Sequence, residues 1–139
     1  MVELITVMII AGVLAAVAIP RIFDNSAFQS RGFYDQVIST LRYAQKAAIA
    51  QNRYVCVAFT ASSITLTYGT TNACGSNLAN LAGSTPYTVS APSSNVILSG
   101  YTPFNFDALG KPSFATAQSI TVSGYASSVT VETETGYVH

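Results

Sequence analysis

The chain opens with a segment that is apolar on every face and predicts a hydrophobic N-terminal helix. From Leu4 to Pro20 the sequence contains no charged residue, and Thr6 carries the only hydroxyl group. A helix of this length is about 25 Å long, near the lower limit of roughly 17 residues for crossing a bilayer. A signal peptide is the competing interpretation, but it requires a basic n-region, and Glu3 stands there instead. We therefore predict a hydrophobic helix over residues 1–24 that anchors the chain in a membrane.

A second helix is predicted over residues 31–52, where the pattern becomes amphipathic. Apolar residues recur there at spacings of three and four, which is the period of a helix with one buried face. They are Phe33, Val37, Leu41, Ala44 and Ala48. This stripe is expected to face a sheet, and Asn52 is predicted as the C-terminal residue of the helix.

From residue 53 onward the helical period disappears, and short β-rich runs alternate with turn residues, which is typical of antiparallel strands. The predicted strands are Tyr54–Phe59, Ser63–Tyr68, Asn95–Leu98, Pro103–Phe106, Ser119–Ser123, Ser128–Glu132 and Tyr137–Val138. Between them, Gly69–Pro92 is predicted to be a long loop. The fold class is thus α+β, with a long N-terminal helix packed on the antiparallel sheet of a single head spanning residues 25–139.

Composition and charge argue against general binding of polyanions. Charged residues make up 9% of the 139 residues, the formal net charge is zero, and none lies between Arg53 and Asp107. Arg42, Lys46 and Arg53 lie toward the end of the second predicted helix, where they complement the helix dipole. A polyanion site is the alternative, but three cations neutralise too few phosphates for tight binding. Nucleic acid is therefore not an expected partner.

Cys56 and Cys74 lie among predicted strands and loops, with no histidine or further cysteine near them to complete a metal site. A disulfide between them is the leading interpretation, and it would stabilise the fold by roughly 3 kcal/mol in an oxidising compartment. Two buried, unpaired thiols are the alternative.

The sequence offers no convincing catalytic group, so we expect neither an enzyme nor a bound cofactor or metal. The only histidine is His139, the last residue of the sequence given. Glu132 and Glu134 share a strand face and could form a carboxylate pair, although solvated strand charges are far commoner. Gly110 and Lys111 lack the surrounding residues of a phosphate-binding loop.

Glu3 is the anomaly of the apolar segment. An ionised carboxylate among apolar residues costs several kcal/mol unless a partner neutralises it or it reaches the headgroup region. No basic residue follows until Arg21. A free α-amino group on a neighbouring molecule is the simplest partner, and a carboxylate at the membrane surface is the alternative.

The run VELITVMIIAGVLAAVAIPR resembles the N-terminal segment of mature type IV pilins and type II secretion pseudopilins. That resemblance implies that Glu3 pairs with the amino terminus of an adjacent subunit and that Pro20 matches the helix-kinking proline. It also implies processing by a prepilin peptidase and methylation of the new N-terminus. Met1 stands where the family has Leu, so we expect upstream codons to encode a basic leader ending in Gly-Phe-Thr.

Three further segments, LRYAQKAAIAQNRYVCV, FNFDALGKPS and VTVETETGYVH, are similar to GspH/FimT-type minor pseudopilins, and most of all to MshC-type subunits of the mannose-sensitive haemagglutinin (MSHA) pilus system. The resemblance implies a minor subunit that enters the inner membrane with its head in the periplasm. It would then initiate, cap or decorate a pilus or pseudopilus through contacts of the N-terminal helix with other subunits.

The alternative function is a membrane-anchored extracytoplasmic binding module that does not polymerise, either adhesin-like or a DNA-uptake minor pilin. One branch of the family binds DNA through a basic C-terminal Gly-Arg motif. Here the corresponding positions, residues 136–139, contain no arginine. DNA binding is accordingly the less favoured form of this alternative.

Overall fold

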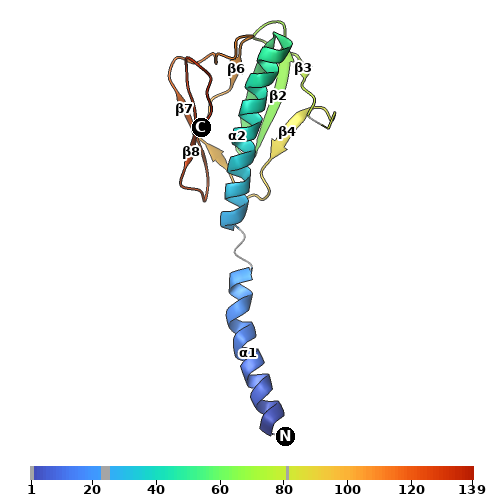
Figure 1. The fold of residues 1–139 in the computed structure, drawn as a ribbon, viewed down its shortest axis with the longest axis vertical. Helices are drawn as coiled ribbons and strands as arrows, with labels where there is room; N and C mark the ends of the chain where they lie inside the picture. Colours follow the sequence, from blue (N-terminus) through green and yellow to red (C-terminus); the bar gives the residue numbers. More distant parts are fainter. Residues whose placement is uncertain (1, 23–25, 81) are drawn as a thin grey trace.

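The computed structural model describes residues 2–22, 26–80 and 82–139, with the side-chain surroundings of residues 17–22 outside that description. Two helices come first, α1 (Val2–Ile22) and α2 (Ser26–Gln51), and α1 extends away from the head (Figure 1). Eight strands follow in the described part of the chain: β1 (Tyr54–Thr60), β2 (Ser63–Gly69), β3 (Ser76–Asn77), β4 (Tyr87–Ser90), β5 (Leu98–Ser99), β6 (Phe104–Phe106), β7 (Gln118–Val122) and β8 (Ser128–Val131).

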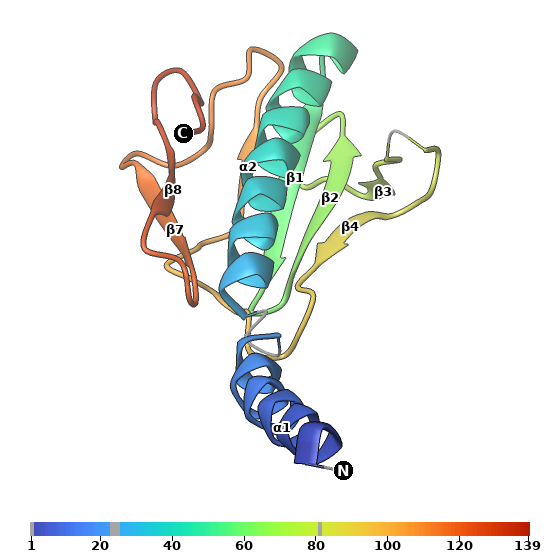
Figure 2. The same ribbon diagram turned by 60° about the horizontal axis from the view of Figure 1, so that its bottom comes forward.

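The strands form two antiparallel sheets against which α2 packs. The first sheet has the order β3-β2-β1-β6, and β4 also pairs with β2. Because β4 pairs with the first half of β2 and β3 with its last residues, these two strands share one edge of β2. The second sheet has the order β5-β7-β8. Figure 2 shows α2 running across the head, with β7 and β8 on one side and β1 to β4 on the other.

The core lies between α2 and the two sheets, as the apolar stripe of the second helix predicts. Every residue of that stripe is buried, and inward positions of the strands complete the cluster. On β1 the alternation places Val55, Val57 and Phe59 inward. Burying a side chain of this size contributes about 1.5–3 kcal/mol. The predicted α+β class, a helix packed on antiparallel strands, is therefore confirmed.

Both ends of α2 have local explanations. The helix begins at Ser26, five residues before the predicted start at residue 31. Ser30 in this first part is buried against Gly124, and such tertiary packing outweighs the weak helix propensity of Ser and Gly. At the other end Asn52 has a φ of 51°. The main-chain N–H groups of Asn52 and Arg53 donate to carbonyls of the last turn, which is a Schellman cap.

The predicted loop Gly69–Pro92 is wrong in part, because it contains β3 and β4. Their pairing with β2 uses main-chain groups, so Ser76 and Asn77 form a strand despite low β-propensity. Two predicted strands are also shorter than expected. Tyr137–Val138 forms only an isolated bridge to β8, and the run predicted at Asn95–Leu98 is reduced to β5. Long-range pairing, which sequence periodicity does not encode, decided each case.

Candidate functional site

The helix α1 exposes an apolar surface on all sides. Every residue from Val2 to Ala16 is exposed, and nine of them are large hydrophobic side chains with 57% to 77% of their surface accessible. They are Val2, Leu4, Ile5, Val7, Met8, Ile9, Ile10, Val13 and Leu14. A helix that is apolar all round is normally buried in protein or lipid. This surface therefore requires a covering that the head does not supply.

Glu3 lies in the first turn of α1 and is exposed. Its main-chain carbonyl accepts a hydrogen bond from the Thr6 hydroxyl at 2.8 Å. In the part of the chain that the structure describes, no basic side chain contacts its carboxylate. The carboxylate is thus available to a partner from another molecule.

The structure describes the other predicted features of the apolar segment only in part. The side chain of Pro20 lies outside the described residues, as does that of every residue from 17 to 20 in the expected membrane span. Among the described ranges 2–22, 26–80 and 82–139, no helix has both the length and the apolar character needed to cross a membrane.

Cys56 and Cys74 form a disulfide in the head, remote in sequence from Glu3. Cys56 lies in β1, opposite Thr67 of β2 and Asn105 of β6, and Cys74 lies in the segment between β2 and β3. The bond therefore ties the chain leading into β3 to the centre of the first sheet. The structure leaves no free cysteine among the described residues.

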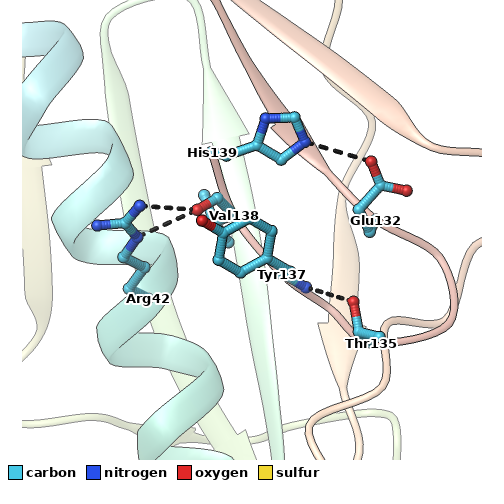
Figure 3. Close-up of polar contacts among 6 residues, drawn as sticks. All are labelled: Arg42, Glu132, Thr135, Tyr137, Val138 and His139. Carbon is cyan, nitrogen blue, oxygen red and sulfur yellow. Dashed lines mark hydrogen bonds and ion pairs between the residues drawn. The ribbon is translucent and has the colours of Figure 1, made fainter.

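Two of the three basic residues near the end of α2 contact other parts of the head. Arg42 donates two hydrogen bonds, from Nε at 3.1 Å and Nη2 at 2.9 Å, to the main-chain carbonyl of Val138 (Figure 3). The guanidinium of Arg53 lies 5.6 Å from the ring centroid of Tyr68. Of the three cations, only Lys46 has no partner within the described part of the chain.

The carboxylates near the C-terminus have separate partners. Glu132 contacts the ring of His139 at 3.2 Å, as Figure 3 shows, and Glu134 pairs with Lys111 at 2.8 Å. The hydrogen bond to Glu134 raises the pKa of Lys111 above its ordinary value. Because each glutamate engages a different side chain, the two do not form the carboxylate pair considered from their spacing.

A junction of two glycines joins the C-terminal segment to α2. Gln45 donates from Nε2 to the carbonyls of Gly110, at 3.1 Å, and Thr135, at 2.8 Å. Gly136 has a φ of 64°, and a Cβ there would lie 2.6 Å from Gln45 Nε2. The segments singled out from the sequence contain both glycines and Gln45, but nothing in the sequence indicates that these residues meet, because that depends on contacts across the fold.

Comparison with known families identifies the class of protein. The family model for the type II transport protein GspH matches residues 34–136, which is most of the chain. The chain belongs to this family of pseudopilins and minor pilins. No curated protein and no solved structure matches the chain significantly.

Proposed function

We propose that this chain is a minor pilin or pseudopilin subunit that enters the inner membrane and then joins a pilus or pseudopilus. Residues 1–24 form the anchor and filament-core helix, and residues 25–139 form the periplasmic head. The chain acts as a structural subunit and performs no catalysis. The observation that carries this proposal is the uniformly exposed apolar surface of α1, joined to a head of the GspH family.

The energetics of α1 support burial against other subunits or lipid. Covering nine large apolar side chains that are more than half exposed removes an unfavourable contact with water of about 10–20 kcal/mol. Transfer from lipid to a helical bundle adds little hydrophobic gain, so close packing must select partners. Ala11, Gly12 and Ala15 leave room for close helix approach, and nothing lies within 4 Å of a Cβ built at Gly12.

In this proposal Glu3 pairs with the N-terminal amino group of an adjacent subunit, and a prepilin peptidase and N-methylation prepare that terminus. The test is Glu3→Ala and Glu3→Gln in the native cells, with Glu134→Gln as a matched exposed control. We expect both Glu3 variants to remain in the membrane fraction but to be about tenfold less abundant in sheared filaments. Without the carboxylate, the amino group of the adjacent subunit is an unpaired charge, which is costly in an apolar bundle. Normal incorporation of Glu3→Gln would refute the pairing.

The finer assignment rests on the segments RYAQK and ETGYVH, which favour an MshC-type subunit of an MSHA pilus that initiates, caps or decorates the filament. Purification of that pilus followed by detection of this chain tests the assignment.

A non-polymerising binding module would stay with the membrane when filaments are sheared. If the chain slowed the migration of duplex DNA in a gel at physiological salt, DNA binding would become the favoured alternative function.

A further inference from the structure

A hollow of about 380 Å³ lies between the end of α2 and the edge of the first sheet that carries β3. A volume of this size is near the lower end of the range for small-molecule sites. We call it the tyrosine–amide pocket. Its lining side chains include Tyr43, Gln51, Tyr68, Asn77, Leu78 and Thr85.

One wall of the tyrosine–amide pocket is fixed by Tyr43. The Tyr43 hydroxyl donates to the carbonyl of Ala79 at 3.1 Å, and its ring stacks on Tyr87 with centroids 5.1 Å apart. Leu78 beside it is buried, and its N–H donates to Leu66 of β2. These contacts join α2 to the segment between β3 and β4, so the pocket has a defined shape before any ligand binds.

The disulfide and a turn hold the two ends of the segment around β3, which carries the lining residues Asn77 to Asn80. The bond to Cys56 holds Cys74 just before β3, and a Cβ at Gly69 would lie 2.9 Å from Cys74 Cα, so the two backbones are in close contact. Beyond β3, the Asn80 side-chain oxygen accepts hydrogen bonds from Ala82 and Ser84 at 2.9 Å and 2.8 Å. Preorganisation of this kind lowers the entropic cost of binding a ligand.

Four of the polar side chains that line the pocket make no hydrogen bond within the described part of the chain, whereas Tyr43 and Asn80 are already engaged. In the described part of the chain, the side chains of Gln51, Asn77 and Thr85 and the hydroxyl of Tyr68 have no hydrogen-bond partner. Among the described residues, no carboxylate or ammonium group lines the hollow, and the nearby guanidinium of Arg53 faces the ring of Tyr68. The site therefore offers amide and hydroxyl groups beside aromatic rings, without a charge to select an ion.

We propose that the tyrosine–amide pocket binds a neutral polyhydroxylated ligand, such as a short glycan. Sugar rings present apolar C–H faces that pack on tyrosine, and hydroxyl groups that both donate to and accept from side-chain amides. An anion would find no cation on the lining, and a wholly apolar ligand would leave the amides unpaired. This binding activity goes beyond filament assembly and uses different residues.

The test is saturation-transfer NMR and titration with the full-length oxidised chain in a detergent that contains no sugar. The probes are glucose, galactose, N-acetylglucosamine and lactose, with glucuronate as the anionic counterpart of glucose. We expect binding of at least one neutral probe, weaker binding of glucuronate than of glucose, and a loss of about tenfold in affinity for Tyr68→Ala. Tyr137→Ala, at an exposed tyrosine outside the pocket, is the matched control and should bind normally.

Because Tyr68→Ala could disturb the sheet, Gln51→Ala and Asn77→Ala provide independent variants at exposed positions, and each should weaken binding several-fold. The proposal is overturned if no neutral probe binds, if glucuronate binds better than glucose, or if Tyr137→Ala and the pocket variants lose affinity equally. All pocket variants should still enter filaments. Glu3→Ala should still bind the sugar, which separates this proposal from the assembly function.

Discussion

The glycine junction gives the sharpest prediction about stability, because Gly136 combines two constraints that can be tested separately. Its φ of 64° lies in the left-handed region, and a Cβ would collide with the carbonyl of Gly110 and lie 3.1 Å from Phe106 Cε1. Gly136→Ala must therefore shift the backbone of the C-terminal segment. That shift would disturb both hydrogen bonds donated by Gln45.

The magnitude follows from these contributions. Left-handed backbone strain at alanine costs about 1–2 kcal/mol. Overpacking in a tight site costs about 1–3 kcal/mol, and weakening the hydrogen bonds of Gln45 costs about 1 kcal/mol. We therefore expect Gly136→Ala to lower the free energy of unfolding by about 3–6 kcal/mol, which is a large part of the 5–15 kcal/mol typical of a domain.

The assay is urea unfolding in a nonionic detergent, followed by tyrosine fluorescence, because all eight tyrosines lie in the head. Two other glycines are matched controls. Gly83 has a φ of 84° but nothing within 4 Å of its added Cβ, so Gly83→Ala should cost only the strain of about 1–2 kcal/mol. Gly32 lies in α2 with open space, so Gly32→Ala should stabilise by up to about 1 kcal/mol.

The test of this reasoning is the predicted order of the free energies of unfolding, which should be lowest for Gly136→Ala, higher for Gly83→Ala and highest for Gly32→Ala. If Gly136→Ala destabilises no more than Gly83→Ala, then the contacts with Gly110 and Gln45 do not restrict this position. In that case the junction contributes only its backbone conformation, and the role assigned to Gln45 must be abandoned.

Three further predictions use the same unfolding assay or a titration. Replacing Cys56 and Cys74 by alanine should lower the free energy of unfolding by about 3 kcal/mol, because the disulfide closes a loop of 18 residues. As a control, the variant and the unaltered protein should be equally stable under reducing conditions. Arg42→Met should cost about 1–2 kcal/mol and increase proteolysis of the C-terminal segment, because two hydrogen bonds to it are lost. The pKa of Lys111, measured by NMR, should fall toward its ordinary value in Glu134→Gln. Since the folded pKa is raised, any stability from this pair is present below the unfolded pKa and lost as the pH rises through the folded one.

The elements with strong periodicity could be predicted from the sequence. The stripe from Phe33 to Ala48 faces the core as its spacing requires, and β1 and β2 match their predicted runs closely. These segments succeed because local pattern and tertiary burial agree. The predicted start of α2 was five residues too late, because the first turns are stabilised by the packing of Ser30 against Gly124, which is distant in sequence.

The site was predictable only where its chemistry is local. Glu3 stands out because a charge in an apolar run is anomalous without any knowledge of the fold. The tyrosine–amide pocket gave no such signal, because Gln51, Tyr68 and Asn77 lie on α2, β2 and β3, and only the packing of the fold and the pairing of β3 with β2 bring them together. Because residues 69–92 were predicted to form a loop, that pairing was not anticipated from the sequence.

The distribution of contacts separates assembly from stability in this chain. The core of the head is made by α2 and the strands, whereas the residues from Val2 to Ala16 are exposed and contribute no buried side chain to it. Changes on α1 should therefore alter partner binding without weakening the head. Glu3→Ala should leave the urea midpoint of tyrosine fluorescence unchanged while it reduces incorporation into filaments. A shifted midpoint would mean that α1 packs against the head, and the assembly defect could then arise from partial unfolding instead of a lost ion pair.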